Sequence, residues 1–463
     1  MTKNTDILFI YPTTGWEPEA MFIAENDAPP MGLLYVAAAA RTDGIKVVVL
    51  DLNHTILDDS GVAKFVSHAR PRLVAFSVLT TSSSRAKHLI AMIKNRFPDI
   101  ILVAGGIHAT VLPQDLLSAG VDYVVRGEGE ATMLELAHAL LDNKPTDEIP
   151  GLAYIDGRQA KTHVQGDSLR LFQPSTPSFI ETPKRSVLVD LDTLPFPARD
   201  LVPIRNYGQA GAICSSRGCP YSCSFCSSLL SSGHSYRLRS IAKTIEEMDD
   251  IHDRFGIDRF QFLDDNFTAN PDRAKSLAKS LLSRRYVWSC QTTIMELADR
   301  LDILDLMFEA GCREIYFGLE TGSKRMMREC KGIELDRAMT VLTHAASLRS
   351  TNGRSDMERL QTVVGFIIGH PKDNEETIEE TIQLALKLRR LDIDTMISIM
   401  QPYPGSLLHR FPKRYGVKIE NTEYSEYLYP KANLSTRYLN RDRIRSLYAS
   451  GLLRIMETYK EKG

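Results

Sequence analysis

Short apolar runs alternate with amphipathic stretches along the first 145 residues of the chain. The stretches at residues 32–41 and 85–97 have the apolar spacing of helices that pack on a sheet. The strand-like runs lie at residues 7–11, 47–50, 73–78, 100–103 and 123–125. Because strands and helices alternate, we predict a parallel sheet covered on both faces, with ligands beyond the carboxyl ends of its strands. The expected fold is α/β, with a flavodoxin-like or Rossmann-like domain over residues 1–145.

The alternation stops in the segment 146–205, which is rich in Pro, Thr and Asp. Pro195, Pro197 and Pro203 lie close together there, and proline interrupts both helices and strands. We therefore predict a linker over residues 146–205, with a small hairpin at residues 152–162.

A second alternation follows the linker. Its strand-like runs lie at residues 211–215, 259–263, 288–292, 314–319, 362–368 and 395–400. Long amphipathic stretches separate them, for example at residues 240–255 and 375–391. Six strand and helix units are too many to extend the first sheet, so we predict a second α/β domain over residues 206–405. The charged remainder, residues 406–463, is expected to be short and mostly helical.

The length, hydrophobic content and charge balance of the chain favour a multidomain globular protein without a strongly charged surface. The 463 residues are 43% hydrophobic, and 56 basic residues nearly balance 58 acidic ones. A nucleic-acid surface or an anionic-membrane patch is therefore not expected. The amino terminus lacks the apolar core of a signal peptide, and no segment runs for about 18 apolar residues without a charge. We expect a cytoplasmic protein with neither a membrane nor a nucleic-acid partner.

The seven cysteines all lie between Cys214 and Cys330. Three of them, Cys219, Cys223 and Cys226, are spaced CxxxCxxC in the loop after the first strand of the second domain. Soft thiolates select zinc or iron–sulfur centres, and a triplet would leave one iron of a [4Fe–4S] cluster without a protein ligand. Two alternatives stay open: a zinc site, and an electron-transfer cluster with Cys214 as its fourth ligand. The other cysteines are isolated and are expected to be small core hydrophobes.

The CxxxCxxC motif in this position resembles the radical S-adenosylmethionine (radical SAM) superfamily. The resemblance implies a partial (β/α)6 barrel and an oxygen-sensitive [4Fe–4S] cluster whose open iron binds the amino and carboxylate groups of S-adenosylmethionine. In that family the cluster cleaves this cofactor to a 5′-deoxyadenosyl radical. Segments after later strands, among them Phe262 to Phe267, Gly318 to Ser323, Gly365 to Pro371 and Pro402 to Gly405, resemble the family's cofactor-binding elements. The S-adenosylmethionine contacts that the resemblance implies are Phe225, Asp264, Asp265, Gln291, Glu320, Ser323 and Ile367.

The third strand departs from the family pattern. Relatives often carry an arginine shortly after a Cys-Gln or Ala-Gln pair, whereas this chain reads Cys290-Gln291-Thr-Thr-Ile. The missing arginine removes a cation that could hold a carboxylate.

The first domain resembles cobalamin-binding domains in its turns. Ser77-Val-Leu79 ends the third strand and Gly105-Gly106 ends the fourth, in the order of that family's Ser-x-Leu and Gly-Gly elements. The cobalamin contacts that the resemblance implies are Ser77, Leu79, Thr80, Gly105, Gly106, Gly127 and Glu128. The alternative is that these are ordinary turns, which favour Gly and Ser. The Asp-x-His-x-x-Gly element is absent, because the spacing in Asp51-Leu-Asn-His54 is wrong.

Both resemblances together point to the cobalamin-dependent subgroup of radical SAM enzymes. They imply a methyltransferase that acts on an unactivated centre of a small metabolite or natural-product intermediate, with a reductant such as flavodoxin or ferredoxin as partner. A second hypothesis keeps the radical enzyme but makes the first domain vestigial, which leaves a cobalamin-independent dehydratase, epimerase or oxidoreductase. A third hypothesis is an electron carrier or sensor. Neither the substrate nor the oligomeric state is specified by the sequence.

Overall fold

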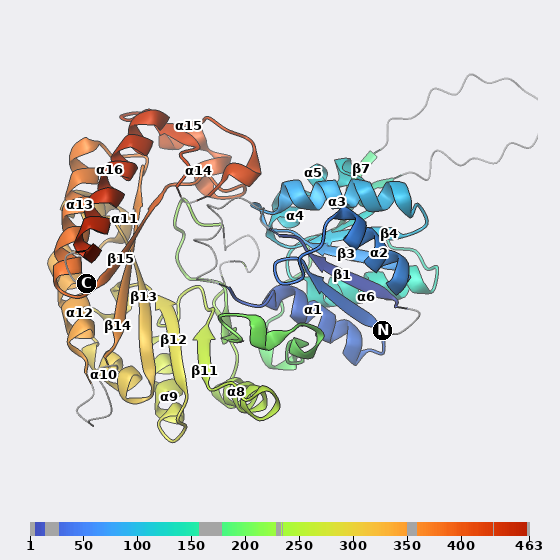
Figure 1. Ribbon diagram of the computed structural model, residues 1–463, viewed down its shortest axis with the longest axis horizontal. Coiled ribbons are helices and arrows are strands. Elements are labelled where there is room, and N and C mark those ends of the chain that lie inside the picture. Colours follow the sequence, from blue (N-terminus) through green and yellow to red (C-terminus); the bar gives the residue numbers. More distant parts are fainter. Residues whose placement is uncertain are drawn as a thin grey trace, which may run out of the picture. The chain divides into compact units, whose positions relative to one another are not determined.

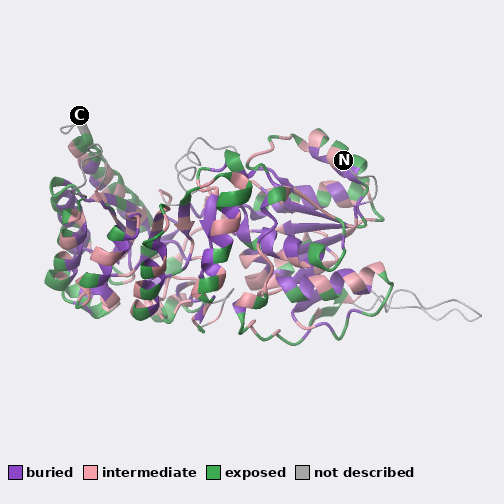
Figure 2. Ribbon diagram, turned by 90° about the horizontal axis from the view of Figure 1, so that it is seen from below, coloured by how far each residue is buried: buried purple, intermediate pink, exposed green. Residues whose placement is uncertain are grey.

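The computed structural model describes residues 5–13, 27–156, 178–227, 233, 235–349, 359–428 and 430–460. Two compact units make up the chain (Figure 1). The first consists chiefly of Pro30–Leu188 and Leu194–Ile204, and the second chiefly of Arg205–Gly463. Buried residues are concentrated on the strands of both units (Figure 2).

The first unit contains a seven-stranded sheet in the order β2-β1-β3-β4-β5-β6-β7. Its five parallel strands are β1 (Ile7–Tyr11), β2 (Val47–Asp51), β3 (Leu73–Ser77), β4 (Ile101–Gly105) and β5 (Tyr123–Val125). The order 2-1-3-4-5 is that of flavodoxin-like doubly wound folds, so the predicted fold class is confirmed. Two antiparallel strands, β6 (Leu152–Asp156) and β7 (Ser178–Glu181), extend the sheet beyond β5.

These added strands lie within the segment 146–205 that was predicted to be a linker. Part of that segment therefore belongs to the first sheet. A strand does begin at Leu152, as the predicted hairpin requires. The second half of that hairpin, residues 157–162, lies outside the described residues.

Helices cover both faces of the first sheet, because alternate strand residues point to opposite faces. Leu8, Val74 and Phe76 share one buried cluster with residues of α2 (Asp59–Ala69) and α3 (Ser83–Arg96). The short α4 (Ile107–Val111) and α5 (Pro113–Ser118) contribute to the same cluster. On the other face, α1 (Met31–Thr42) and α6 (Gly129–Leu141) contact each other.

The second unit contains a sheet of six parallel strands in the order β15-β14-β13-β12-β11-β8. The strands are β8 (Gly211–Ile213), β11 (Arg259–Phe262), β12 (Val287–Thr292), β13 (Cys312–Glu320), β14 (Gln361–Ile368) and β15 (Asp394–Ile399). Each is within two residues of its predicted position. Within the described residues β8 and β15 occupy opposite ends of the order and do not pair, so the barrel is partial.

One layer of helices covers this sheet. The layer comprises α8 (Ile241–Phe255), α9 (Pro271–Leu281), α10 (Leu301–Glu309), α12 (Leu335–Ser347) and α13 (Glu375–Arg390). The helices from α8 to α12 contact one another in sequence, and α13 contacts β14 and β15. The short α11 (Lys324–Lys331) follows β13. Cys290 and Cys312 are buried in the core beneath these helices, as expected for small hydrophobes.

The carboxy-terminal region packs on the end of the second sheet. It begins with α14 (Leu407–Arg410) and α15 (Pro412–Tyr415) and ends with α16 (Arg441–Lys460), which contacts α13 and β15. The region is mostly helical, as predicted. An unpredicted antiparallel pair, β16 (Val417–Ile419) and β17 (Leu434–Thr436), lies between these helices. In the described part of the chain, no helix is both long and apolar enough to cross a bilayer.

Candidate active site

The cysteine loop leaves the carboxyl end of β8 and is closed at its base by a two-stranded ribbon. In this ribbon β9 (Ser216–Arg217) pairs antiparallel with β10 (Arg237–Leu238). Gly218 begins the loop with φ +84°, and a Cβ atom there would lie 2.5 Å from the Ser235 carbonyl oxygen. Glycine is therefore required where the two arms of the loop meet.

Cys219, Cys223 and Cys226 are half-buried in this loop, and none forms a disulfide. The Cys226 N–H donates to the Cys223 carbonyl oxygen at 3.1 Å, which closes a tight turn. The pKa of Cys219 is raised to about 11, chiefly by burial; a hydrogen bond from the Tyr221 backbone lowers it, and Asp265, Cys223 and Cys226 contribute to the rise. The thiols of Cys223 and Cys226 thus disfavour the ionisation of Cys219 electrostatically. Because only thiolates bind metals, a bound cation must hold these groups ionised.

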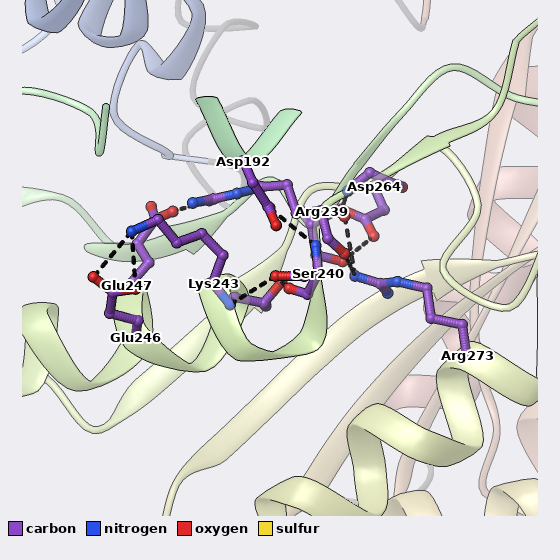
Figure 3. A network of polar contacts seen from close by, with 11 residues as sticks. Asp192, Arg239, Ser240, Lys243, Glu246, Glu247, Asp264 and Arg273 are labelled. Atoms are coloured by element: carbon purple, nitrogen blue, oxygen red, sulfur yellow. Dashed lines mark hydrogen bonds and ion pairs between the residues drawn. The ribbon is translucent and has the colours of Figure 1, made fainter. Parts of the chain in front are cut away.

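Asp264 fixes the start of the loop (Figure 3). Its carboxylate is 1% exposed and accepts hydrogen bonds from the Ser215 N–H at 2.7 Å, the Ser216 N–H at 3.0 Å and the Ser215 hydroxyl at 2.5 Å. Burial raises the pKa of Asp264, whereas the Arg273 guanidinium and these hydrogen bonds lower it. Arg273 also donates to the Ser215 carbonyl oxygen at 3.0 Å. Asp264 and Arg273 thus hold the segment that leads from β8 into the cysteine loop.

A second polar network holds the middle of the loop. The Tyr221 hydroxyl donates to Glu296 Oε1 at 2.6 Å, and the Asn266 side-chain amide donates to the same oxygen at 2.9 Å. Asn266 is fully buried, and its Oδ1 accepts from the Thr292 hydroxyl at 2.8 Å. The cysteine loop is therefore tied to the ends of both β11 and β12. Sequence reasoning missed these residues.

The carboxy-terminal region holds the loop at a third point. The Leu408 N–H of α14 donates to the Ser224 carbonyl oxygen at 2.8 Å, between Cys223 and Phe225. The Phe225 ring packs against the core and meets the His370 ring edge-on, with 5.8 Å between the ring centroids. Phe225 therefore lies beside the end of β14.

The remaining residues predicted for this site lie at the carboxyl ends of the same sheet. Asp265 and Gln291 are exposed, and the Gln291 side-chain amide donates to the Asp264 carbonyl oxygen at 3.2 Å. Surrounding protein and the neighbouring Asp264 carboxylate raise the pKa of Asp265. Ser323 is buried at the start of α11, and Ile367 is half-buried on β14. Glu320 ends β13 and pairs with Lys331 at 3.2 Å.

In the first unit, the turns after β3 and β4 contact each other through their backbones. The Val78 N–H donates to the Gly105 carbonyl oxygen at 2.8 Å, and the His108 N–H donates to the Val78 carbonyl oxygen at 3.1 Å. Gly106 has φ +94°, and a Cβ atom there would lie 2.8 Å from the Val78 oxygen. Ser77, Leu79 and Thr80 therefore lie at the same sheet edge as the two glycines.

Thr110 joins the turn after β5 to this edge. Its hydroxyl donates to the Gly106 carbonyl oxygen at 2.9 Å and accepts from the Gly127 N–H at 2.9 Å. The neighbouring Glu128 carboxylate accepts from the Leu188 N–H at 3.1 Å. The residues predicted for cobalamin binding are thus gathered at one edge, with Thr110 as a connecting residue that the sequence pattern did not reveal.

Comparison with known families assigns the two units separately. A model of the B12 binding domain matches residues 21–137, and a model of the radical SAM superfamily matches residues 213–385. The chain is a radical SAM protein with an amino-terminal B12-binding domain. The family predicted from the cysteine motif and the turns of the first domain is confirmed.

Several similar proteins are named as methyltransferases. An uncharacterized methyltransferase of Pyrococcus horikoshii is 29% identical over 88% of this chain and 83% of its own length. A cytidylyl-2-hydroxyethylphosphonate methyltransferase of Streptomyces wedmorensis is also 29% identical, over 69% of this chain and 66% of its own. The structure of the methyltransferase TsrM from Kitasatospora setae, with cobalamin and a [4Fe–4S] cluster, superposes with a TM-score of 0.70. At 18% identity it covers 98% of this chain and 88% of its own, which supports the fold.

The two matched families give this radical SAM protein a [4Fe–4S] cluster, S-adenosylmethionine and cobalamin as its cofactors. In the described part of the chain, no three His, Cys, Asp or Glu side chains gather as the ligands of a single metal ion do. Each thiolate of a cluster binds a different iron, so the cysteine loop does not need such convergence. For cobalamin, Gly127 has φ +81°, and its missing Cβ would point into open space at the sheet edge. Both sets of residues fit their cofactors.

Proposed function

We propose that this protein is a cobalamin-dependent methyltransferase that acts on an unactivated centre of a small metabolite or natural-product intermediate. One observation carries the proposal. The same chain contains a three-cysteine loop at the end of a radical SAM sheet and, in its B12-binding domain, turns after β3 and β4 that contact each other at one end of the sheet. Two relatives are named as methyltransferases. When bound, the cofactors supply a reactive radical and a transferable methyl group.

In this proposal, the chain's own residues bind and position those cofactors. Cys219, Cys223 and Cys226 ligate the cluster, while Asp264 and Glu296 hold their loop. Phe225 contacts the adenine of S-adenosylmethionine. The remaining S-adenosylmethionine contacts come from the ends of β11 to β14, namely Asp265, Gln291, Glu320, Ser323 and Ile367. The cobalamin contacts are Ser77, Leu79, Thr80, Gly105, Gly106, Gly127 and Glu128.

The proposed enzyme needs an external one-electron reductant such as flavodoxin or ferredoxin. A half-buried loop that is anchored at Ser215, Tyr221 and Ser224 limits the access of water and oxygen to the cysteines. Because the proposed cluster is oxygen-sensitive, the reaction is still expected to require anaerobic conditions.

Anaerobic reconstitution with and without cobalamin tests the proposed function. We expect the purified protein to retain corrinoid absorbance, and label from methyl-deuterated S-adenosylmethionine to reach the bound corrinoid after reduction. A protein that never retains a corrinoid would contradict the methyltransferase and favour the cobalamin-independent radical enzyme. Release of 5′-deoxyadenosine on reduction would exclude an electron carrier or sensor.

A further inference from the structure

An exposed cluster of cations lies at the start of the carboxy-terminal region. Arg410 ends α14, and Lys413 and Arg414 lie in the last turn of α15, which contacts α14 (Figure 1). Arg437 follows β17 and lies beside Gly416, where an added Cβ atom would be 3.7 Å from the arginine side chain. All four basic residues are exposed, and we call them together the basic surface.

The basic surface has a local excess of positive charge. No acidic residue occurs in the sequence between Asp394 and Glu420. Among the described residues, none of the four cations pairs with a carboxylate, and Glu420 is already bound by Lys418 and by the Ser435 hydroxyl, each at 2.8 Å. The chain as a whole is nearly neutral, so this excess is a local feature that can select a negatively charged partner.

Two aromatic rings are exposed among these cations. Phe411 is 45% exposed, and the guanidinium carbon of Arg410 lies 5.4 Å from the centre of its ring. Tyr438, which follows Arg437, is 58% exposed. Rings in this position add little to the hydrophobic core, whereas aromatic residues and arginine are enriched at protein interfaces. The composition of the basic surface is therefore that of a docking site for another protein.

The basic surface is joined directly to the cysteine loop. Leu408 lies in the same single turn of α14 as Arg410 and donates its N–H to the Ser224 carbonyl oxygen at 2.8 Å. Arg410 is only about 3 Å further along the helix axis. Because Ser224 lies between Cys223 and Phe225, a protein docked on the basic surface would lie beside the loop that carries the three cysteines.

We propose that the basic surface docks a small acidic electron-carrier protein, of the flavodoxin or ferredoxin class, which reduces the cluster. One electron passes from the reduced carrier to the oxidised cluster, and no proton or other group is transferred. Docking beside the cysteine loop shortens the path of this electron, and opposite charges speed the encounter of the two proteins. The inference rests on the external reductant of the proposed function, but not on cobalamin or methyl transfer.

Charge reversal on the basic surface provides the test. Cluster reduction in the reconstituted holoprotein would be followed by freeze-quench electron paramagnetic resonance, with reduced flavodoxin, reduced ferredoxin or reduced methyl viologen as donor. Methyl viologen is a small cation that needs no protein surface. In Arg410→Glu/Lys413→Glu/Arg414→Glu we expect the second-order rate constant with the protein carriers to fall about 10-fold or more. The viologen rate, iron content and thermal unfolding should stay near wild type, because these residues are exposed.

Two further measurements do not depend on electron transfer to the cluster. The affinity of the holoprotein for oxidised flavodoxin, measured by calorimetry, should fall about 10-fold or more in the same variant. In the wild type this affinity should weaken as salt is added, since salt screens exposed charges. Both effects are expected from docking and not from a change at the cysteines.

Lys279→Glu/Arg285→Glu/Lys387→Glu is the matched control. It reverses three exposed cations near the amino ends of β12 and β15, and two of them lie in the last turn of a helix, as on the basic surface. This variant should reduce and bind the carriers like the wild type.

The inference is wrong if both triple variants slow the protein carriers equally, if the basic-surface variant leaves them unchanged, or if viologen alone reduces the wild type. Unchanged carrier kinetics with a loss of binding to vesicles of anionic phospholipid would assign the basic surface to a membrane instead. Failure to retain a corrinoid or to release 5′-deoxyadenosine would overturn the proposed function, while cluster reduction and carrier binding would still report on the docking site.

Discussion

Asp264 and Asp265 are neighbours in sequence but occupy opposite environments. Asp264 is buried and accepts three hydrogen bonds from the start of the cysteine loop, whereas Asp265 is exposed. Successive side chains in an extended segment point in opposite directions, so one acid faces the protein and the other faces outward. Asp265 is thus the better placed of the two to meet a ligand, and Asp264 acts as a support for the loop.

Asp264→Ala is expected to destabilise the protein and weaken cluster retention. It removes the carboxylate that accepts three hydrogen bonds and leaves the buried Arg273 guanidinium without its nearby countercharge. Breaking a buried charge pair costs about 3–5 kcal/mol, so denaturant unfolding should shift by that amount and iron content should fall. Asp265→Ala is the matched control and should leave stability and iron content near wild type. Equal iron loss in both variants would contradict the supporting role of Asp264.

The cysteine variants distinguish a three-cysteine cluster from a fully protein-ligated one. Cys219→Ala, Cys223→Ala and Cys226→Ala should each abolish cluster binding, because every thiolate holds a different iron. Cys214 directly follows β8, before the ribbon that closes the loop, so Cys214→Ala should retain most of the iron. Iron and sulfide analysis of anaerobically reconstituted variants checks this. Iron loss in the Cys214 variant as large as in the others would make Cys214 a ligand.

At the residue scale, site residues that lie close together in the sequence could be predicted, whereas contacts between residues far apart in the sequence could not. The cysteine triplet could be predicted because all three ligands lie within eight positions. Glu296 could not, since its partner Tyr221 is 75 residues away and no pattern links them. The ion pair between Lys331 and Glu320 was missed as well, because a lysine at the end of a helix is usually exposed.

At the scale of elements, the strands that could be predicted were those long enough to show a recognisable pattern of hydrophobic residues. All six strands of the second sheet lie within two residues of their predicted positions. The ribbon of β9 and β10 has two residues a strand, too few to show an alternation, and it was missed. The strand β7 was missed as well, because its pairing with β6 depends on a partner that precedes it by about twenty residues. These short pairs nevertheless shape the loop and the edge of the first sheet.

Gly106→Ala tests whether the contact between the turns after β3 and β4 is needed for cobalamin binding. The substitution adds a Cβ atom 2.8 Å from the Val78 oxygen at a position with φ +94°. We expect a loss of stability of about 2 kcal/mol or more and loss of corrinoid absorbance, because clash and backbone strain combine. Gly44→Ala is the control, since Gly44 has φ +86° but no atom within 4 Å of its added Cβ. A Gly106 variant that binds cobalamin like the Gly44 variant would remove these turns from the cofactor site.

At the scale of the whole molecule, each unit has its own buried cluster and its own set of cofactor residues. The first cluster includes Leu8, Val74 and Leu102, and the second includes Phe262, Trp288 and Phe317. The cysteine loop is anchored by residues of the second unit, at Asp264, Glu296 and Leu408. The turns of the first unit are likewise held by residues of that unit, such as Thr110.

Because the supports named above come, among the described residues, from the unit that contains each site, the two cofactors should load independently in the full-length protein. A variant with Ala at Cys219, Cys223 and Cys226 should retain the corrinoid absorbance of the wild type while containing no cluster iron. Gly106→Ala should show the reverse, with full iron content and 5′-deoxyadenosine release but no corrinoid. Parallel iron analysis and corrinoid spectra on both variants measure this. If removing the cysteines also removes the corrinoid, or Gly106→Ala also loses the cluster, residues of one unit must support the cofactor of the other.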